Sequence, residues 1–329
     1  NLSLEATINP DFSQVEADAT KIDINSPTAI NYPEKRPFFN RGIDAMDYSL
    51  DVFYSRAINN PSFAGKIINQ GKKSRLYLLS AFDEESPYLV PTQYESFSGV
   101  GGKSFSNIVR YQNFINTNAQ IGILSSNRSY EGGAYGNLFG VDALFKFSDI
   151  WKFELEYFVN SNKEPIADWI DSDKKFGDYT VRLDGEKING SALYAEIRRE
   201  TENWRSFIQY TDLSQGFRSD NGFITGNDLK KYSLWHSYYQ FPNTDLLKNY
   251  RISLRQDFTY NQNNDIARSN FQYYIQILTI LNTDILYNYE YNFVKTHLDA
   301  KFEDFTNHWI RMSTRPSSFL SFSLFYTWG

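Results

Sequence analysis

The chain repeats one pattern over most of its length, in which apolar and polar residues alternate through short segments. In residues 285–293, Ile, Tyr and Phe occupy every second position, with Leu, Asn and Glu between them. Residues 320–328 alternate Leu, Phe, Tyr and Trp mainly with Ser and Thr. Because successive side chains of a strand point to opposite faces, each segment would have one apolar and one polar face. Further alternating segments begin at Lys152, Tyr179, Leu193 and Tyr250.

Turn-forming residues separate these segments. They are Asp184-Gly185, Asn189-Gly190, Asp220-Asn221-Gly222 and Gly226-Asn227. Gly and Asn adopt the positive φ that tight hairpin turns require. Strands that follow one another through tight turns, with no amphipathic helix between them, pair in antiparallel order. The sequence therefore predicts an all-β antiparallel meander of about 14 or more strands.

The alternation alone does not say which face lies inside. A soluble β protein buries the apolar face, whereas a membrane barrel turns it toward lipid around a polar lumen. Several segments have the ~9–11 residues of a membrane-crossing strand, Trp and Tyr lie near segment ends as in interfacial girdles, and the polar faces carry Arg and Glu. We therefore predict an antiparallel transmembrane β-barrel over residues 1–329, in contact with the lipid bilayer of a Gram-negative outer membrane. A soluble sandwich or propeller is the alternative.

Composition narrows the function classes. The net charge is −6 and no basic tract occurs, so nucleic acid is not an expected partner. The chain has no Cys, which excludes thiolate catalysis and thiolate metal sites. Mean hydropathy is −0.52, and no run of ~18 apolar residues occurs, which excludes a membrane-spanning helix.

Residues 9–48 differ from the rest of the chain. They contain four prolines and a charge cluster at Glu34, Lys35 and Arg36, which disfavour a central strand. One hypothesis places this segment inside the lumen, where Lys35 and Arg36 would meet carboxylates such as Glu154 or Glu156. The other is a solvated loop. The candidate lumen residues are Asp11, Phe12, Glu16, Asp18, Glu34, Lys35, Arg36, Phe38 and Phe39.

Three motifs in this part of the chain carry a resemblance: NPDFSQVEAD (Asn9–Asp18), YPEKRPFF (Tyr32–Phe39) and VFYSR (Val52–Arg56). They resemble a large, uncharacterised family of Bacteroidota and proteobacteria. In that family a family-9 carbohydrate-binding-like domain precedes an outer-membrane β-barrel. Softer similarities follow in order at Asn107–Gln112, from Val141, at Asp184–Tyr194 and at Phe217–Thr225.

The resemblance implies an outer-membrane location and a barrel that these residues do not complete. The carbohydrate-binding-like domain and several C-terminal strands of the family would lie outside this chain. The sequence departs from the family at Asn40, Arg41 and Gly42, where Leu-Glu-Gly is usual after the paired Phe.

No catalytic, cofactor-binding or metal site is predicted. The histidines, His236, His297 and His308, have no metal-site spacing. Asp11, Glu16, Asp18 and Asp23 offer oxygen ligands for Ca²⁺, but without ligand spacing a solvated loop is favoured, as it is for Asp83, Glu84 and Glu85 before Pro87. Tyr130 and Trp169 fall in predicted loops and are the candidate ligand contacts.

Three functions agree with these observations. The first is a channel or transport barrel, or a barrel that forms a complex with other outer-membrane subunits. The second is a membrane anchor for a glycan-binding surface domain. The third, least favoured, is an enzyme with converging loop or lumen carboxylates. The face on which Arg and Glu lie discriminates the membrane hypothesis from the soluble one.

Overall fold

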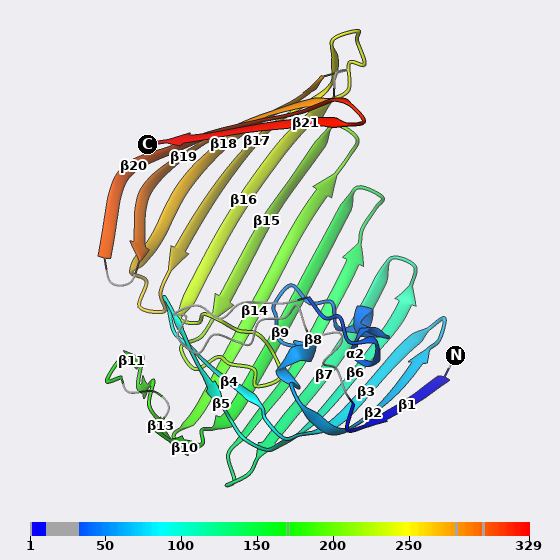
Figure 1. Ribbon diagram of the computed structural model, residues 1–329, viewed down its shortest axis with the longest axis vertical. Helices are drawn as coiled ribbons and strands as arrows, with labels where there is room; N and C mark the ends of the chain where they lie inside the picture. The colour runs from blue at the N-terminus through cyan, green and yellow to red at the C-terminus, as the bar shows by residue number, and fades with distance from the viewer. Residues whose placement is uncertain (1, 11–32, 169, 171, 280–281, 298–299) are drawn as a thin grey trace. The chain divides into compact units, whose positions relative to one another are not determined.

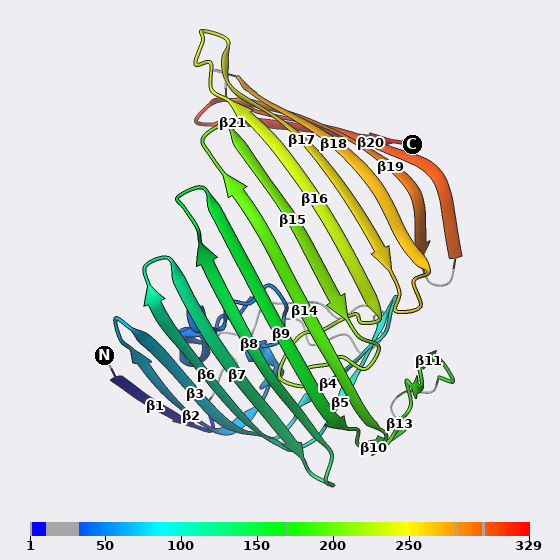
Figure 2. The same cartoon turned by 180° about the vertical axis from the view of Figure 1, so that it is seen from behind.

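The computed structural model describes residues 2–10, 33–168, 170, 172–279, 282–297 and 300–329. These residues fold almost entirely into β-strands, and the main ladder within them has 15 antiparallel strands (Figures 1 and 2). In spatial order the strands are β1 (Leu2–Ile8), β2 (Pro61–Gln70), β3 (Ser74–Asp83), β6 (Ser104–Asn116), β7 (Ala119–Tyr130), β8 (Tyr135–Lys146), β9 (Trp151–Lys163), β14 (Lys187–Glu200), β15 (Trp204–Leu213), β16 (Leu229–Gln240), β17 (Leu247–Tyr260), β18 (Ile266–Thr279), β19 (Thr283–His297), β20 (Ala300–Ser317) and β21 (Leu320–Trp328).

The all-β antiparallel meander predicted from the alternation is confirmed, because every neighbour in the main ladder follows its partner in chain order. Within the described residues, however, no ladder joins β1 to β21, so the predicted barrel closure is not seen. No helix in that part of the chain is long and apolar enough to cross a membrane.

Short elements interrupt the meander. The helical turns are α2 (Pro37–Asn40), η1 (Ile43–Met46) and η2 (Ser55–Ala57). The small strand pairs are β4 (Pro87–Pro91) with β5 (Ser96–Val100), β10 (Ile166–Ala167) with β13 (Leu183–Asp184), and β11 (Lys175–Phe176) with β12 (Tyr179–Thr180).

Two local predictions were wrong. Residues 179–184 do not form one strand but contribute two short ones, because Val181 and Leu183 turn into a local apolar cluster rather than joining the main ladder. Asn189-Gly190 is not a turn and lies within β14. A Cβ at Gly190 would lie 2.4 Å from the backbone of Gly216, so this glycine serves a close approach of two backbones inside a strand.

The described chain divides into two compact units, each of which we treat by itself. Unit 1 is Asn1–Phe145, Glu154–Tyr194 and Asp212–Leu229, and unit 2 is Lys146–Phe153, Ala195–Thr211 and Lys230–Gly329. In unit 1, residues 33–60, which we call the docked segment, pack against one face of the strands. The buried cluster joins Phe39, Met46, Leu50, Val52 and Ile58 of this segment to strand residues Tyr77, Leu79, Ile108, Leu124, Leu138 and Phe158.

Candidate functional site

The strands of unit 1 bury the face that carries their arginines, together with apolar residues such as Ile108 and Leu124, and expose a face of apolar side chains. In β6, Arg110 is 2% exposed, whereas its neighbours Val109 and Tyr111 are 39% and 38% exposed. The register continues the apolar face from Tyr111 to Ile123 of β7 and Val141 of β8, which are 45% and 41% exposed. A soluble core has the opposite arrangement, because apolar side chains leave water on folding.

The charge of Arg110 is neutralised on the buried face. Its guanidinium pairs with Asp142, with one Nη2–Oδ1 distance of 2.9 Å, and its Nε donates to the carbonyl of Ala45 in the docked segment. Gly122 leaves room for this pair, since a Cβ there would lie 2.2 Å from Nη1 of Arg110. The ion pair therefore connects the sheet to the docked segment.

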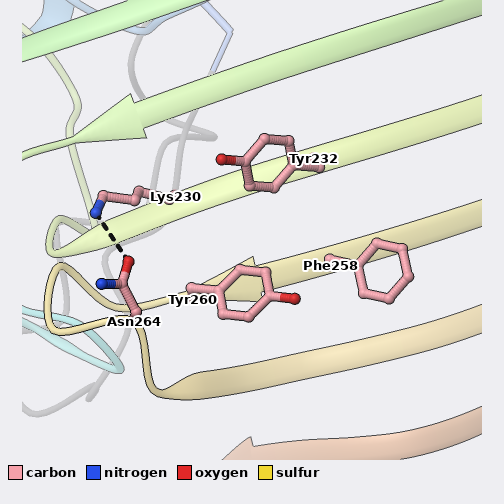
Figure 3. Close-up of a pocket in the computed structure, with 5 residues that line it drawn as sticks. All are labelled: Lys230, Tyr232, Phe258, Tyr260 and Asn264. Atoms are coloured by element: carbon pink, nitrogen blue, oxygen red, sulfur yellow. Dashed lines mark hydrogen bonds between the residues drawn. The ribbon is translucent and has the colours of Figure 1, made fainter.

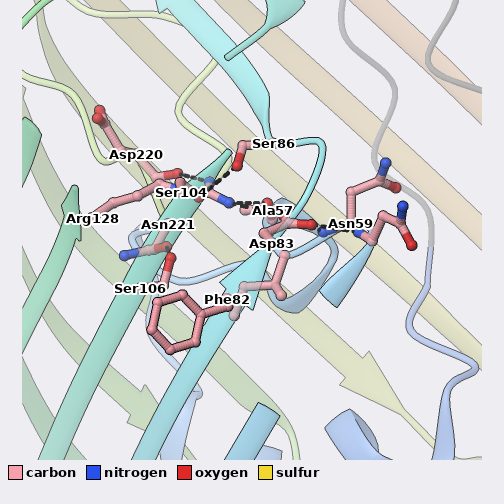
Figure 4. Close-up of polar contacts among 12 residues, drawn as sticks. Ala57, Asn59, Phe82, Asp83, Ser86, Ser104, Ser106, Arg128, Asp220 and Asn221 are labelled. Carbon is pink, nitrogen blue, oxygen red and sulfur yellow. Dashed lines mark hydrogen bonds and ion pairs between the residues drawn. The ribbon is translucent and has the colours of Figure 1, made fainter. Parts of the chain in front are cut away.

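A second guanidinium on this face, that of Arg128, joins three distant parts of the chain (Figure 4). Its Nη2 lies 3.2 Å from Oδ2 of Asp83 and donates to the carbonyl of Ala57 at 2.6 Å. Its Nη1 donates to the carbonyl of Asp220 at 2.8 Å. Asp83 also accepts the amides of Asn59 and Asn60 at 2.8 and 2.6 Å. The expectation that Asp83 is solvated was wrong, because it caps the end of the docked segment.

Arg36 anchors the docked segment from within. Its guanidinium binds Glu34 at 2.7 Å and donates to the carbonyls of Ile58 and Ser55 at 2.8 and 3.0 Å. Burial acts to raise the pKa of Glu34, but the hydrogen bonds and charge of Arg36 outweigh it and hold that pKa below its usual value. Arg36 therefore stabilises the segment's own fold.

Strand side chains bind the backbone of the same segment. Glu156, which we expected to meet Arg36 or Lys35, instead accepts the amides of Ser49 and Leu50 at 2.6 and 3.2 Å. The sequence pattern could not show this, because a carboxylate can be satisfied by backbone amides as well as by a cation. Lys66 of β2 donates to the carbonyls of Phe38 and Arg41, the latter at 2.8 Å.

A fourth buried ion pair joins the loop between β9 and β14 to the loop between β15 and β16. Nη1 of Arg218 lies 2.9 Å from Oε1 of Glu164 and 3.2 Å from the hydroxyl of Tyr88. Burial, together with the nearby carboxylates of Glu186 and Asp184, raises the pKa of Glu164 to about 7 against the opposing charge and hydrogen bond of Arg218. Oε2 of Glu164 has no hydrogen-bond partner among the described residues.

Unit 2 repeats the separation of faces. The register aligns Tyr238, Ile252, Ile275, Tyr287 and Ile310 across β16–β20 on the apolar face. The polar face of unit 2 is defined by these residues: Trp235, Tyr239, Arg251, Arg255, Gln272, Tyr274, Asn288 and Trp309. A cavity of about 220 Å³ opens on this polar face.

The apolar face of unit 2 also has a hollow, at one end of β16 and β17 (Figure 3). Tyr232, Phe258 and Tyr260 line a volume of about 520 Å³. Nζ of Lys230 donates to Oδ1 of Asn264 at 3.2 Å beside it. Aromatic rings next to a lysine at a strand end are typical of the interfacial zone of membrane proteins.

The structure places only some of the residues predicted from the sequence. Asp11, Phe12, Glu16, Asp18, Asp23 and Trp169 lie outside the described residues. Glu34, Arg36 and Phe39 lie in the docked segment, where Phe38 packs edge-to-face on Phe39 with ring centroids 5.0 Å apart, while Lys35 is exposed. Tyr130 is not in a loop but ends β7, 5% exposed against Tyr88, and its role as a ligand contact stays a prediction.

Sequence reasoning missed the residues that form the buried network. Arg110 and Arg128 occupy polar positions in alternating strands, so their face could have been identified. Their partners could not, since Asp142, Asp83 and the carbonyl of Asp220 lie 32, 45 and 92 positions away in the chain.

The model of a family described as a domain of unknown function (DUF5916) matches residues 1–75. The matched part covers β1, the docked segment, β2 and the start of β3. No curated protein matches the chain. The match is therefore to an uncharacterised family over residues 1–75. The outer-membrane barrel family of Bacteroidota and proteobacteria, with its carbohydrate-binding-like domain, stays an expectation.

Proposed function

We propose that this chain forms the wall of a transmembrane β-barrel in the outer membrane of a Gram-negative bacterium, and that its polar face holds or passes a polar solute. The observation that carries this proposal is the inverted burial of the strands. Arg110 and Arg128 are buried, whereas Val109, Ile123 and Phe139 expose 39%, 45% and 51% of their surface.

The inversion has a direct physical reason in a bilayer. Apolar surface gains roughly 25 cal/mol for each Å² removed from water, and lipid removes it as a protein core does. Large contiguous exposed apolar patches are rare on soluble monomers. A polar interior also suits buried arginines, because carboxylates and backbone carbonyls can satisfy them there. Lipid on one face and a polar interior on the other would satisfy both sets of residues.

Adjacent residues on opposite faces of β18 provide the test. The chain has no Cys, so Ile275→Cys and Gln276→Cys each introduce a single thiol. Ile275 lies on the apolar face and Gln276 on the polar one. In lipid vesicles, a water-soluble maleimide should label Gln276→Cys and leave Ile275→Cys unlabelled, while a lipid-soluble maleimide should label Ile275→Cys. Equal labelling of both thiols by the water-soluble reagent would reject the membrane assignment.

A second candidate function is that of a membrane anchor for a glycan-binding surface domain, and the docked segment favours it. Residues 33–60 cover the polar face of unit 1 and are held there by Glu156, Lys66 and Arg110 of the strands. A filled interior suits an anchor or a closed state better than an open pore. Planar-bilayer recordings separate the two: ion-conducting steps from the wild-type protein favour a channel, and a silent bilayer with correctly inserted protein favours the anchor.

A further inference from the structure

The cavity on the polar face of unit 2 is lined by aromatic, cationic and carboxamide side chains. Its volume is about 220 Å³, below the ~300–1,000 Å³ of sites for drug-sized ligands, so it admits one ring-sized group. Beside Ser253, the cavity is lined by Trp235, Arg251, Arg255, Gln272, Tyr274 and Asn288. They supply rings, guanidinium groups and carboxamides in one place.

Arg251 gives the cavity its charge preference. Within the described part of the chain, no carboxylate lies within 4.0 Å of its guanidinium, and its Nε has no hydrogen-bond partner. Its guanidinium instead lies 4.4 Å from the ring centroid of Tyr274 and 5.8 Å from that of Tyr239. Arg255, by contrast, is paired with Asp257 at 2.8 Å. A half-buried arginine without an acid attracts an anion, and its planar fork matches a carboxylate.

Rings and guanidinium groups continue on both sides of the cavity. Arg205 lies 4.8 Å from the ring centroid of Tyr239, and Arg251 lies 5.8 Å from the same ring. On the far side, the rings of Tyr274 and Trp309 meet edge-to-face at 6.4 Å. These five residues form a row that crosses β15–β20, so a ligand longer than one ring can extend along it.

A second row approaches the cavity from β14. The guanidinium of Arg198 lies 5.4 Å from the ring centroid of Phe207, and the rings of Phe207 and Trp235 stack at 5.4 Å. Trp235 is paired in register with Arg255. Trp235 therefore stands between ring neighbours on one strand and a guanidinium on the next, which fixes its position as a wall of the cavity.

We propose that this cavity binds one sugar unit of an acidic oligosaccharide. The carboxylate would bind Arg251, the C–H face of the sugar would lie on Trp235 or Tyr274, and the hydroxyls would bond to Gln272 and Asn288. A sugar acid combines an apolar face, a rim of hydroxyls and a negative charge, which are the complements of these three kinds of lining group. A simple anion would bind only Arg251. A neutral sugar would leave the charge of Arg251 without a partner of opposite charge.

This inference rests on the proposed function in one respect, namely that the polar face is the one that water reaches. Calorimetry on the full chain in detergent micelles tests it without a membrane, so failure here leaves the thiol-labelling result unaffected. The probes are trisaccharides of galacturonic, glucuronic and mannuronic acid, their fully methyl-esterified forms, and sodium sulfate.

We expect at least one acid trisaccharide to bind saturably. Its ester should bind at least about tenfold more weakly, because a lost charged hydrogen bond costs about 1.5–3 kcal/mol. Sulfate keeps the charge but lacks the ring and the hydroxyls, so it should also bind more weakly than the acid trisaccharide. Arg251→Gln should weaken binding by about tenfold to a hundredfold, and Trp235→Leu should also weaken it. The matched controls are Arg315→Gln and Trp151→Leu, which change the same residue types outside the cavity and should bind as the wild type does.

Three results would overturn the proposal. One is the absence of binding by all three acid trisaccharides. Another is equal binding of acid, ester and sulfate forms, which would mean a nonspecific or simple anion site. The last is wild-type affinity in Arg251→Gln or Trp235→Leu. If Trp235→Leu does not fold, judged by its far-ultraviolet circular dichroism, Arg251→Gln and the ester comparison decide.

Discussion

The guanidinium of Arg128 lies 3.2 Å from the carboxylate of Asp83, and neither side chain exposes any of its surface. Asp83 holds the amides of Asn59 and Asn60, and Arg128 holds the carbonyls of Ala57 and Asp220. One ion pair therefore secures the end of the docked segment and the 219–222 turn to the sheet.

Removing one partner of this pair should destabilise unit 1. Arg128→Met leaves the Asp83 carboxylate buried without its cation, which costs about 3–5 kcal/mol in comparable cases. Urea unfolding in detergent micelles measures the change. The control is Lys103→Met, which breaks an exposed pair with Glu84 and should leave the unfolding midpoint unchanged. Equal midpoints for both variants would show that the buried pair contributes nothing.

Lys66 should control whether the docked segment stays in place. Its ammonium binds the carbonyls of Phe38 and Arg41 and is 2% exposed. Lys66→Met removes these bonds, so we expect faster proteolysis within residues 33–50 and, in planar bilayers, a larger conductance than the wild type. Lys72→Met, on an exposed turn, is the control. Unchanged proteolysis and conductance in Lys66→Met would contradict an interior role for the segment.

The raised pKa of Glu164 predicts a pH dependence of stability. Its pKa of about 7 exceeds the ordinary 4.5, so between these values the folded state holds a proton that the unfolded state has lost. The free energy of unfolding should therefore fall as pH rises from about 4.5 to about 7. Glu164→Gln should reduce this fall, and exposed Glu131→Gln should retain it in full. Urea unfolding midpoints at pH 5 and pH 8 measure the change. If the midpoint of Glu164→Gln falls between these pH values as much as that of the wild type, Glu164 is not the group responsible.

Gly222 should tolerate no side chain. A Cβ there would lie 2.6 Å from the carbonyl oxygen of Asp51 and 2.8 Å from the backbone of Val52. Gly222→Ala should therefore cost about 1–3 kcal/mol of unfolding free energy through overpacking. Gly226→Ala is the matched control, since its Cβ would meet Thr92 at an ordinary 3.5 Å. Thermal or urea unfolding checks both, and equal loss in the two variants would speak against the close contact.

The alternation of apolar and polar residues predicted the strands, because the face to which a strand residue points is set by its position among its neighbours in the chain. It succeeded for long segments such as 285–293, which lie in β19. It failed at 179–184 and at Gly190, where apolar residues and a glycine serve tertiary contacts that no local pattern encodes. The charge cluster at Glu34 and Arg36 distinguished the docked segment in the sequence. The contacts of Glu156 and Lys66 with this segment could not be predicted, because both side chains bind backbone groups, which every residue type carries.

The Arg128 contacts also have a consequence for the order of folding. Its partners lie 24, 45, 71 and 92 positions away in the chain. Closing such long loops carries an entropic cost that grows with loop length, and contacts of this kind slow folding. Neighbouring strands, joined by short turns, would therefore pair first, and the Arg128 contacts would form as a late step that ends the assembly of unit 1.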